Sequence, residues 1–197
     1  MNPQTAIFIG RSGCGKGTQA QLLIDHLRKV DPLRGIYYLE TGQSFRNFIS
    51  EGGYSGTLAK KISEAGQLQP EFLAVWAWSH LLVDQMKENE HLIIDGTPRR
   101  LHEAPVFDSA MKFYGREKPS IVYINVSREW SKEKLLGRGR GDDTHADIEN
   151  RLNWFETDVI PAINYFRDNQ DYAFLEINGE QTVEEVNKEL LAKMFHD

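Results

Sequence analysis

The sequence has little cysteine, no long hydrophobic run and no excess of basic residues. Cys14 is the only cysteine among 197 residues, which excludes an internal disulfide, and the six histidines are scattered without the spacing of a structural zinc site. Any metal is therefore expected to be held by oxygen atoms. No stretch approaches the roughly 18 consecutive apolar residues of a membrane-spanning helix. The 29 acidic and 23 basic residues argue against general affinity for nucleic acid.

The amino-terminal residues carry no basic run ahead of an apolar stretch, so no secretory signal is expected. Hydrophobic residues make up 40% of the chain and charged residues 26%, which is typical of a globular protein. We therefore expect a cytoplasmic protein without a nucleic-acid or membrane partner. The length fits a single domain, residues 1–197, with one core.

Short β-branched runs alternate with longer amphipathic stretches, a pattern typical of a parallel sheet wrapped by helices. The predicted strands cover residues 5–9, 35–39, 91–94, 120–126 and 172–177. The predicted helices cover residues 15–29, 43–51, 56–65, 71–88, 101–114, 128–137, 145–168 and 182–195. The expected fold class is α/β, with a five-stranded parallel sheet and helices on both faces. Residues 41–70 and the glycine-rich residues 137–141 depart from the alternation and are interpreted as insertions over a site.

A glycine-rich turn follows the first predicted strand and opens the first predicted helix. Residues 10–16 (Gly-Arg-Ser-Gly-Cys-Gly-Lys) have the spacing of a phosphate loop, in which backbone N–H groups converge on an anion and Lys16 binds the β- and γ-phosphates. Gly17 separates Lys16 from Thr18, so Thr18 is only a candidate metal ligand, and water is expected to hold much of the metal. The place of Cys14 near a helix N-terminus predicts a lowered thiol pKa. The donor-binding residues predicted in this loop are Gly10, Ser12, Gly13, Cys14, Gly15, Lys16, Gly17 and Thr18.

Three further segments accompany the phosphate loop. Residues 41–46 (Thr-Gly-Gln-Ser-Phe-Arg) follow the second strand, residues 95–99 (Asp-Gly-Thr-Pro-Arg) end the third, and residues 65–70 (Ala-Gly-Gln-Leu-Gln-Pro) lie between them. With residues 15–19 (Gly-Lys-Gly-Thr-Gln), they resemble the motifs of the adenylate kinase and nucleoside monophosphate kinase family. The resemblance covers nearly the whole chain. It implies a P-loop NTPase fold, ATP as donor, AMP as acceptor, Mg²⁺ as cofactor and a monomer.

The segment from Lys134 to Arg151 resembles the arginine-rich lid of the same family in a short form. The resemblance divides the chain into a core, an acceptor-binding insertion at residues 41–70 and a lid at residues 138–145. The core then comprises residues 1–40, 71–137 and 146–197.

Phosphoryl transfer spreads negative charge over the migrating group, so the site needs positioned cations and little covalent help. The catalytic residues expected from the motifs are Lys16, Arg99, Arg138, Arg140 and Arg151. Outside the phosphate loop, the resemblance implies that the donor nucleotide contacts Lys134, Arg138 and Gln181. It implies acceptor-binding roles for Thr41, Gly42, Arg46, Gln67, Leu68, Gln69, Gly96, Arg99, Glu103, Arg140 and Arg151. Asp95 is expected to orient metal-bound water.

Three residues depart from the family pattern: Gln43 replaces Asp, Thr97 replaces Phe, and Glu103 stands where adenylate kinases usually place the Gln that reads the acceptor adenine. The change at Gln43 predicts weaker metal binding. An ionised glutamate only accepts hydrogen bonds, so Glu103 favours bases that present donors, unless it faces solvent on its helix. Two alternatives therefore stay open: a UMP/CMP or GMP kinase, and a catalytically silent nucleotide-binding module. The four tryptophans, at helical spacing, are expected in the core.

Overall fold

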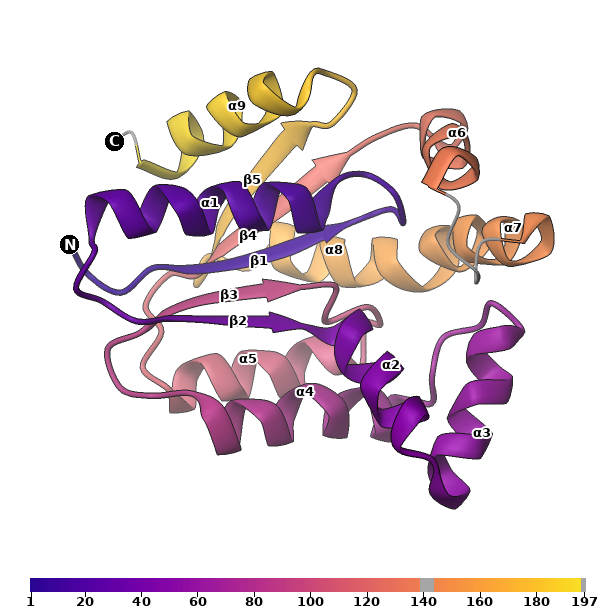
Figure 1. The fold of residues 1–197 in the computed structure, drawn as a ribbon. Helices are drawn as coiled ribbons and strands as arrows, with labels where there is room; N and C mark the ends of the chain where they lie inside the picture. The colour runs from indigo at the N-terminus through magenta and orange to yellow at the C-terminus, as the bar shows by residue number, and fades with distance from the viewer. Residues whose placement is uncertain (139–143, 196–197) are drawn as a thin grey trace.

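The computed structural model describes residues 1–138 and 144–195. Its centre is a five-stranded parallel sheet with the strand order β2-β3-β1-β4-β5 (Figure 1). The strands are β1 (Thr5–Gly10), β2 (Ile36–Glu40), β3 (His91–Asp95), β4 (Ser120–Asn125) and β5 (Ala173–Asn178). All five predicted strands are confirmed, with ends that differ by no more than one residue. Helices connect successive strands, as parallel pairing requires.

The strands are apolar on both faces because helices cover both sides of the sheet. In β1, Ala6 and Phe8 point to one face and Ile7 and Ile9 to the other, and all four are buried. The face that contains Phe8 packs against two helices at the top of Figure 1. These helices are α1 (Lys16–Val30) and α9 (Val183–Phe195).

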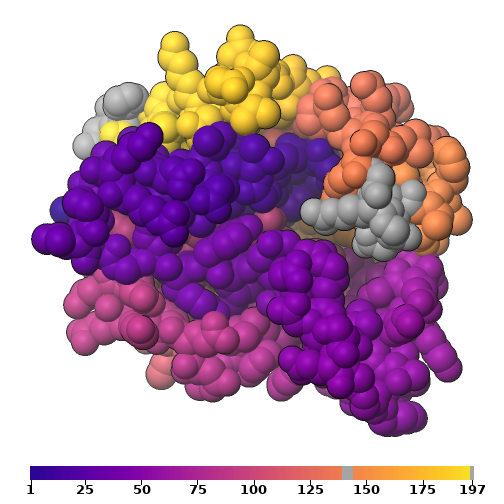
Figure 2. Space-filling view, in the orientation of Figure 1, coloured from indigo at the N-terminus to yellow at the C-terminus, as the bar shows by residue number. Residues whose placement is uncertain are grey.

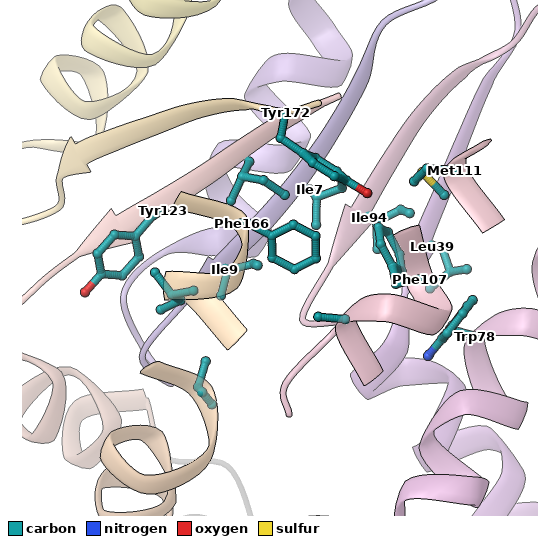
Figure 3. Packing of buried hydrophobic residues seen from close by; sticks show 14 of the residues in the cluster. Ile7, Ile9, Leu39, Trp78, Ile94, Phe107, Met111, Tyr123, Phe166 and Tyr172 are labelled. Carbon is teal, nitrogen blue, oxygen red and sulfur yellow. The ribbon is translucent and has the colours of Figure 1, made fainter. Parts of the chain in front are cut away.

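The opposite face of the sheet holds the larger aromatic core. Trp78, Phe107 and Phe166 pack edge to face, with ring centroids 5.4 Å and 6.3 Å apart in the two successive pairs (Figure 3). They come from the three helices that cover this face. These helices are α4 (Glu71–Gln85), α5 (Glu103–Phe113) and α8 (Ile160–Arg167).

The long helix predicted over residues 145–168 is not one regular α-helix. The structure divides it into α7 (His145–Trp154), a π-helical turn η1 (Phe155–Val159) and α8. Pro161 lies in the first turn of α8. Because proline has no N–H group and its ring crowds the preceding turn, the regular hydrogen-bond ladder is interrupted there, and the wider turn accommodates it.

The helices that do not cover the sheet gather beyond the carboxyl ends of the strands. After β2, residues 41–70 hold α2 (Thr41–Glu51) and α3 (Gly53–Glu64) and no strand, as predicted. After β4, α6 (Arg128–Arg138) leads toward α7. Figures 1 and 2 place the purple α3 and the orange α7 on the same side of the molecule. Within the described part of the chain, no helix combines the length and the apolar character needed to cross a membrane.

Candidate active site

A cavity of about 1180 Å³ lies at the carboxyl ends of the strands. Its lining joins the phosphate loop, α2, the turn before α4, the residues that follow β3, and α6 and α7. In α/β folds with parallel strands, this edge of the sheet is where ligands bind. The predicted site residues in this lining are Ser12, Gly13, Gly15, Lys16, Gly17, Thr18, Thr41, Gly42, Arg46, Gln67, Leu68, Gln69, Asp95, Gly96, Arg99, Glu103, Arg138 and Arg151.

The phosphate loop depends on glycine at particular positions. Gly13 and Gly15 have φ angles of 81° and 95°, which side-chain-bearing residues rarely adopt. A Cβ atom on Gly10 would lie only 2.6 Å from the carbonyl oxygen of Ile124. The Nζ atom of Lys16 donates to the carbonyl oxygen of Gly10, at 2.9 Å. The loop therefore holds an ammonium group at the N-terminus of α1, where the helix dipole favours an anion.

Cys14 of this loop is 3% exposed and belongs to the core cluster that contains Phe8. Burial raises the pKa of the thiol, although the charge of Lys16 opposes the shift. The expectation of a lowered thiol pKa is therefore wrong. The free energy needed to remove the thiolate from water is larger than the stabilisation that the nearby ammonium group and the helix N-terminus give it.

Asp95 and Glu40 are register partners at the carboxyl ends of β3 and β2. Both line the cavity, and the hydroxyl group of Tyr38 lies 3.5 Å from Oδ2 of Asp95. Burial raises the pKa of Asp95, the positive charge of Lys16 lowers it, and the negative charge of Glu40 raises it. The two carboxylates and the ammonium group therefore share one electrostatic environment.

The oxygen atoms near Asp95 fit a magnesium ion that is bound mainly through phosphate and water. Among the described residues, no group of three or more His, Cys, Asp or Glu side chains could surround a metal. Asp95 and Thr18 each contribute oxygen to the cavity lining. Mg²⁺ usually retains several waters and binds one or two carboxylates plus substrate phosphates. The donor set therefore matches an ion that arrives with a nucleotide.

Arg46 and Arg99 bring guanidinium groups into the cavity from α2 and from the residues after β3. Nη2 of Arg46 contacts Oε1 of Glu40 at 2.9 Å and Oε1 of Gln43 at 2.7 Å. Nε of Arg99 donates to the carbonyl oxygen of Gly96 at 2.7 Å. Burial lowers the pKa of Arg99, the negative charges of Glu103 and Asp95 raise it, and Arg46 is among the positive charges that lower it further. Both guanidinium groups thus belong to the lining of one cavity.

Arg138 and Arg151 add two more cations to the same lining, from α6 and α7. The positive charge of Arg151 also lowers the pKa of Arg99, after the larger effect of burial. Arg140, which belongs to the predicted lid, lies outside the described residues. Four arginines from four separate segments therefore converge on one cavity that also contains a phosphate loop.

A comparison of the sequence with protein families shows which family has this combination of a phosphate loop and a cavity lined by arginines. The family model for adenylate kinase matches residues 8–171. The chain belongs to the adenylate kinase family. Its five-stranded parallel sheet, with helices on both faces, is the P-loop NTPase fold of adenylate kinases. The matched region of this family member includes the phosphate loop, residues 41–46, residues 95–99 and α7.

Curated adenylate kinases are similar to this family member over most of their length. Adenylate kinase 1 of Nostoc sp. (strain PCC 7120) is 34% identical over 188 residues, which cover 95% of this chain and 97% of that protein. The adenylate kinase of Corynebacterium aurimucosum is 32% identical over 189 residues, with the same coverage of 95% and 97%. That of Mycobacterium tuberculosis (strain H37Rv) is 34% identical over 166 residues, which cover 82% and 85%.

Some predicted donor-site residues of this adenylate kinase family member do not line the cavity. Lys134 places Nζ 5.0 Å from the ring centroid of Trp130, and Gln181 donates to the carbonyl oxygen of Asn178. Gly10 and Cys14 belong to the phosphate loop but are not part of the cavity lining. Nucleotide contacts of Lys134 and Gln181 stay predictions.

Several lining residues were missed by reasoning from the sequence. The expectation that all four tryptophans lie in the core is wrong: Trp78 is buried, but Trp76 is 42% exposed and Trp154 lines the cavity. The indole N–H of Trp154 donates to the carbonyl oxygen of Gly66 at 3.1 Å. Trp154 lies three residues after Arg151, on the same side of α7, and this spacing is the signal that could have found it.

Arg100 was also missed. It lines the cavity, donates to the carbonyl oxygen of Gln69 and pairs with Asp158 of η1 at 3.2 Å. Arg100 therefore connects the turn of the acceptor-side insertion to the π-helical turn. The sequence offered only its position directly after Arg99, which does not show where the side chain points.

Glu103 is 2% exposed and lines the cavity. The alternative in which it faces solvent is therefore wrong. The backbone N–H of Arg99 lies 3.3 Å from Oε2 of Glu103. Thr97, another departure from the family pattern, is also 2% exposed and lies in the lining. Both departures thus face the site.

Proposed function

We propose that this protein is a nucleoside monophosphate kinase that transfers the γ-phosphoryl group of MgATP to AMP and forms two ADP. The observation that carries the proposal is one cavity that contains both a phosphate loop and a separate group of arginines. Its volume of about 1180 Å³ exceeds the roughly 300–1,000 Å³ of a pocket for one small molecule. Two nucleotides can therefore meet inside it.

The donor side of the cavity is the phosphate loop. In the proposal, backbone N–H groups of the loop and the N-terminus of α1 bind the donor phosphates. The ammonium group of Lys16 now donates to backbone oxygens of the same loop, and in the proposal it turns from them to the donor phosphates. These positive groups offset the charge that develops on the β–γ bridging oxygen as its bond to phosphorus breaks.

The acceptor side is the group of arginines. We assign Arg46 and Arg99 to the acceptor phosphate, and Arg138, Arg140 and Arg151 to the phosphoryl group in flight. A planar guanidinium group can bind two phosphate oxygens at once and stays charged at every working pH. An oxygen of the acceptor phosphate forms the new bond to the γ-phosphorus as the bond to ADP breaks. Because that oxygen is already ionised, no general base is needed.

Mg²⁺ belongs to this proposal as a partner of ATP. When bound, it neutralises charge on the donor phosphates and orients them for in-line transfer. Asp95 would hold it through water, and Thr18 lies in the same lining as a second oxygen donor. Gln43 bonds to Arg46 and carries no charge, so Asp95 is the acid that remains from the family pattern.

Transfer to water competes with transfer to AMP, so the cavity must exclude water when both nucleotides are bound. The insertion at residues 41–70 already touches α7. Asn150 donates to the carbonyl oxygen of Ala65 at 3.0 Å, and Trp154 donates to that of Gly66. We propose that residues 41–70 and the lid at residues 138–145 close over the nucleotides. The family resemblance implies a monomer, and the sequence predicts a cytoplasmic location.

The decisive test measures ADP formation from ATP and AMP in a coupled assay, with and without Mg²⁺. The proposal expects turnover that requires both nucleotides and the metal. Isothermal titration with a bisubstrate analogue that joins two adenosines through phosphates should show one tight complex per chain. Nucleotide binding without ADP formation would instead identify a silent nucleotide-binding module. Turnover with UMP, CMP or GMP but not AMP would leave the reaction class in place and change the acceptor.

A further inference from the structure

Glu103 is a buried carboxyl group in a cavity otherwise rich in arginine. It is the first residue of α5 and is 2% exposed, yet it lines the cavity together with Gln67 and Leu68 of the acceptor-side turn. Its only hydrogen bond to the described residues is the long one from the backbone N–H of Arg99, at 3.3 Å. No ion pair joins Glu103 to a side chain in residues 1–138 or 144–195. The rest of its hydrogen-bonding capacity faces the cavity.

The nearby cations make hydrogen bonds to groups other than Glu103. Nε of Arg99 donates to the carbonyl oxygen of Gly96, and Arg100 is held by Asp158 and by the carbonyl oxygen of Gln69. Their charges still act at a distance, as does the negative charge of Glu71 from α4. A carboxylate that is removed from water without a paired cation is costly, so the neutral form gains.

The sum of these effects favours the protonated, neutral form of Glu103. Burial raises the pKa of Glu103 and is the largest effect. The backbone N–H of Arg99 and the charges of Arg99 and Arg100 lower it, whereas the charge of Glu71 raises it. Glu103 thus holds its proton to a higher pH than an exposed glutamate does.

The two forms of a carboxyl group recognise different bases. A neutral carboxyl presents one O–H donor and one carbonyl acceptor, which match N1 and the 6-amino group of adenine. A carboxylate presents acceptors only, which match the N1–H and 2-amino groups of guanine. The side-chain amide of glutamine also presents one donor group and one acceptor group. A neutral carboxyl group can therefore make the same two hydrogen bonds to adenine.

We propose that Glu103 reads the acceptor base in two protonation states, the neutral carboxyl accepting AMP and the carboxylate accepting GMP, so that pH selects the acceptor. The proton comes from solvent and stays on one Glu103 oxygen while adenine is bound. This inference rests on the acceptor site proposed above. The inference goes beyond that proposal because the choice between AMP and GMP then depends on whether Glu103 carries a proton.

The first test compares AMP and GMP as acceptors across pH, in the wild type and in Glu103→Gln. In the wild type, the ratio of kcat/KM for AMP to that for GMP should fall by about tenfold or more between about pH 5 and about pH 8. In Glu103→Gln it should stay high and flat. The ratio cancels the titration of the nucleotide phosphate, which both acceptors share. The exposed variant Glu117→Gln should follow the wild type.

The second test counts protons without any turnover. AMP binding is followed by calorimetry at about pH 7 in buffers of different ionisation enthalpy. Relative to Glu103→Gln, the wild type should take up a fraction of a proton with AMP and none with GMP. A role for Glu103 in folding or in holding Arg99 would not produce proton uptake.

The outcomes separate this inference from the proposed function. ADP formation with an AMP to GMP ratio that is independent of pH overturns the inference and leaves the kinase in place. An equal loss of both acceptors in Glu103→Gln, without a change in proton uptake, also overturns it. AMP binding with Glu103-dependent proton uptake but no ADP formation supports the inference and rejects the kinase.

Discussion

Trp154 of α7 donates its indole N–H to the carbonyl oxygen of Gly66, at 3.1 Å, and so joins the helix that carries Arg151 to the end of the acceptor-side insertion. The guanidinium group of Arg99 lies 5.7 Å from the ring centroid of the same tryptophan. One side chain therefore contacts both the insertion and a proposed catalytic cation. Trp154 thus links the insertion at residues 41–70 to a guanidinium group of the cavity lining.

Trp154→Phe removes this hydrogen bond and keeps an aromatic ring beside Arg99. A neutral hydrogen bond contributes about 0.5–1.5 kcal/mol net, so KM for the acceptor should rise about two- to tenfold while kcat changes little. Steady-state kinetics with AMP as the varied substrate measures the split. Phe113→Leu, at the exposed end of α5 and outside the cavity lining, is the control and should leave both constants unchanged. A change in kcat alone would contradict a positioning role.

Arg99→Ala removes a half-buried cation from the proposed transition state. We expect kcat to fall about a thousandfold or more, since no other group replaces its paired contact with phosphate oxygens. Arg99→Lys keeps the charge but not the planar fork, and it should recover only part of the loss. Arg28→Ala, on the exposed side of α1, controls for loss of a surface arginine. If Arg99→Ala loses less than about tenfold, Arg99 is not catalytic.

Gly10→Ala tests the close packing of the phosphate loop. The new Cβ would lie 2.6 Å from the carbonyl oxygen of Ile124 and 2.8 Å from Sγ of Cys14. Such overpacking should lower the free energy of unfolding by about 1–3 kcal/mol, as measured by urea denaturation. Gly137→Ala is the control because its Cβ meets nothing within 4 Å, and it should stabilise α6 by up to about 1 kcal/mol. Equal stability of both variants would contradict the tight fit at Gly10.

Cys14 should react slowly with alkylating agents in the folded protein. The thiolate is the reactive form, and burial both raises the pKa of the thiol and blocks access to it. At neutral pH the folded protein should be alkylated at least about tenfold more slowly than the urea-unfolded chain. Once modified, Cys14 should block nucleotide binding, because the added group has no room under the phosphate loop. Rapid labelling of the folded protein, with full activity afterwards, would show that both statements are wrong.

The sequence by itself determined the features that depend on short stretches of chain. Alternating apolar runs predicted all five strands, because the pattern of a buried parallel strand is local. The phosphate loop was readable because glycines at this spacing before a lysine, between a predicted strand and a predicted helix, are typical of a phosphate-binding turn. The position of the two-helix insertion at residues 41–70 followed from the same local patterns. Pro161 was visible as well, but its effect on the ladder depends on the helix around it, and the π-helical turn was missed.

The tertiary structure decided the features that depend on segments brought together from far apart. Desolvation, which sets the direction of the pKa shifts of Cys14 and Glu103, exists only when other elements cover the side chain. The pairing of Glu40 with Asp95 needs the register of β2 on β3. The contact of Trp154 with Gly66 needs α7 to reach the insertion. The sequence shows which residue types are present and in what order. Packing decides which of these side chains are removed from water and which come into contact.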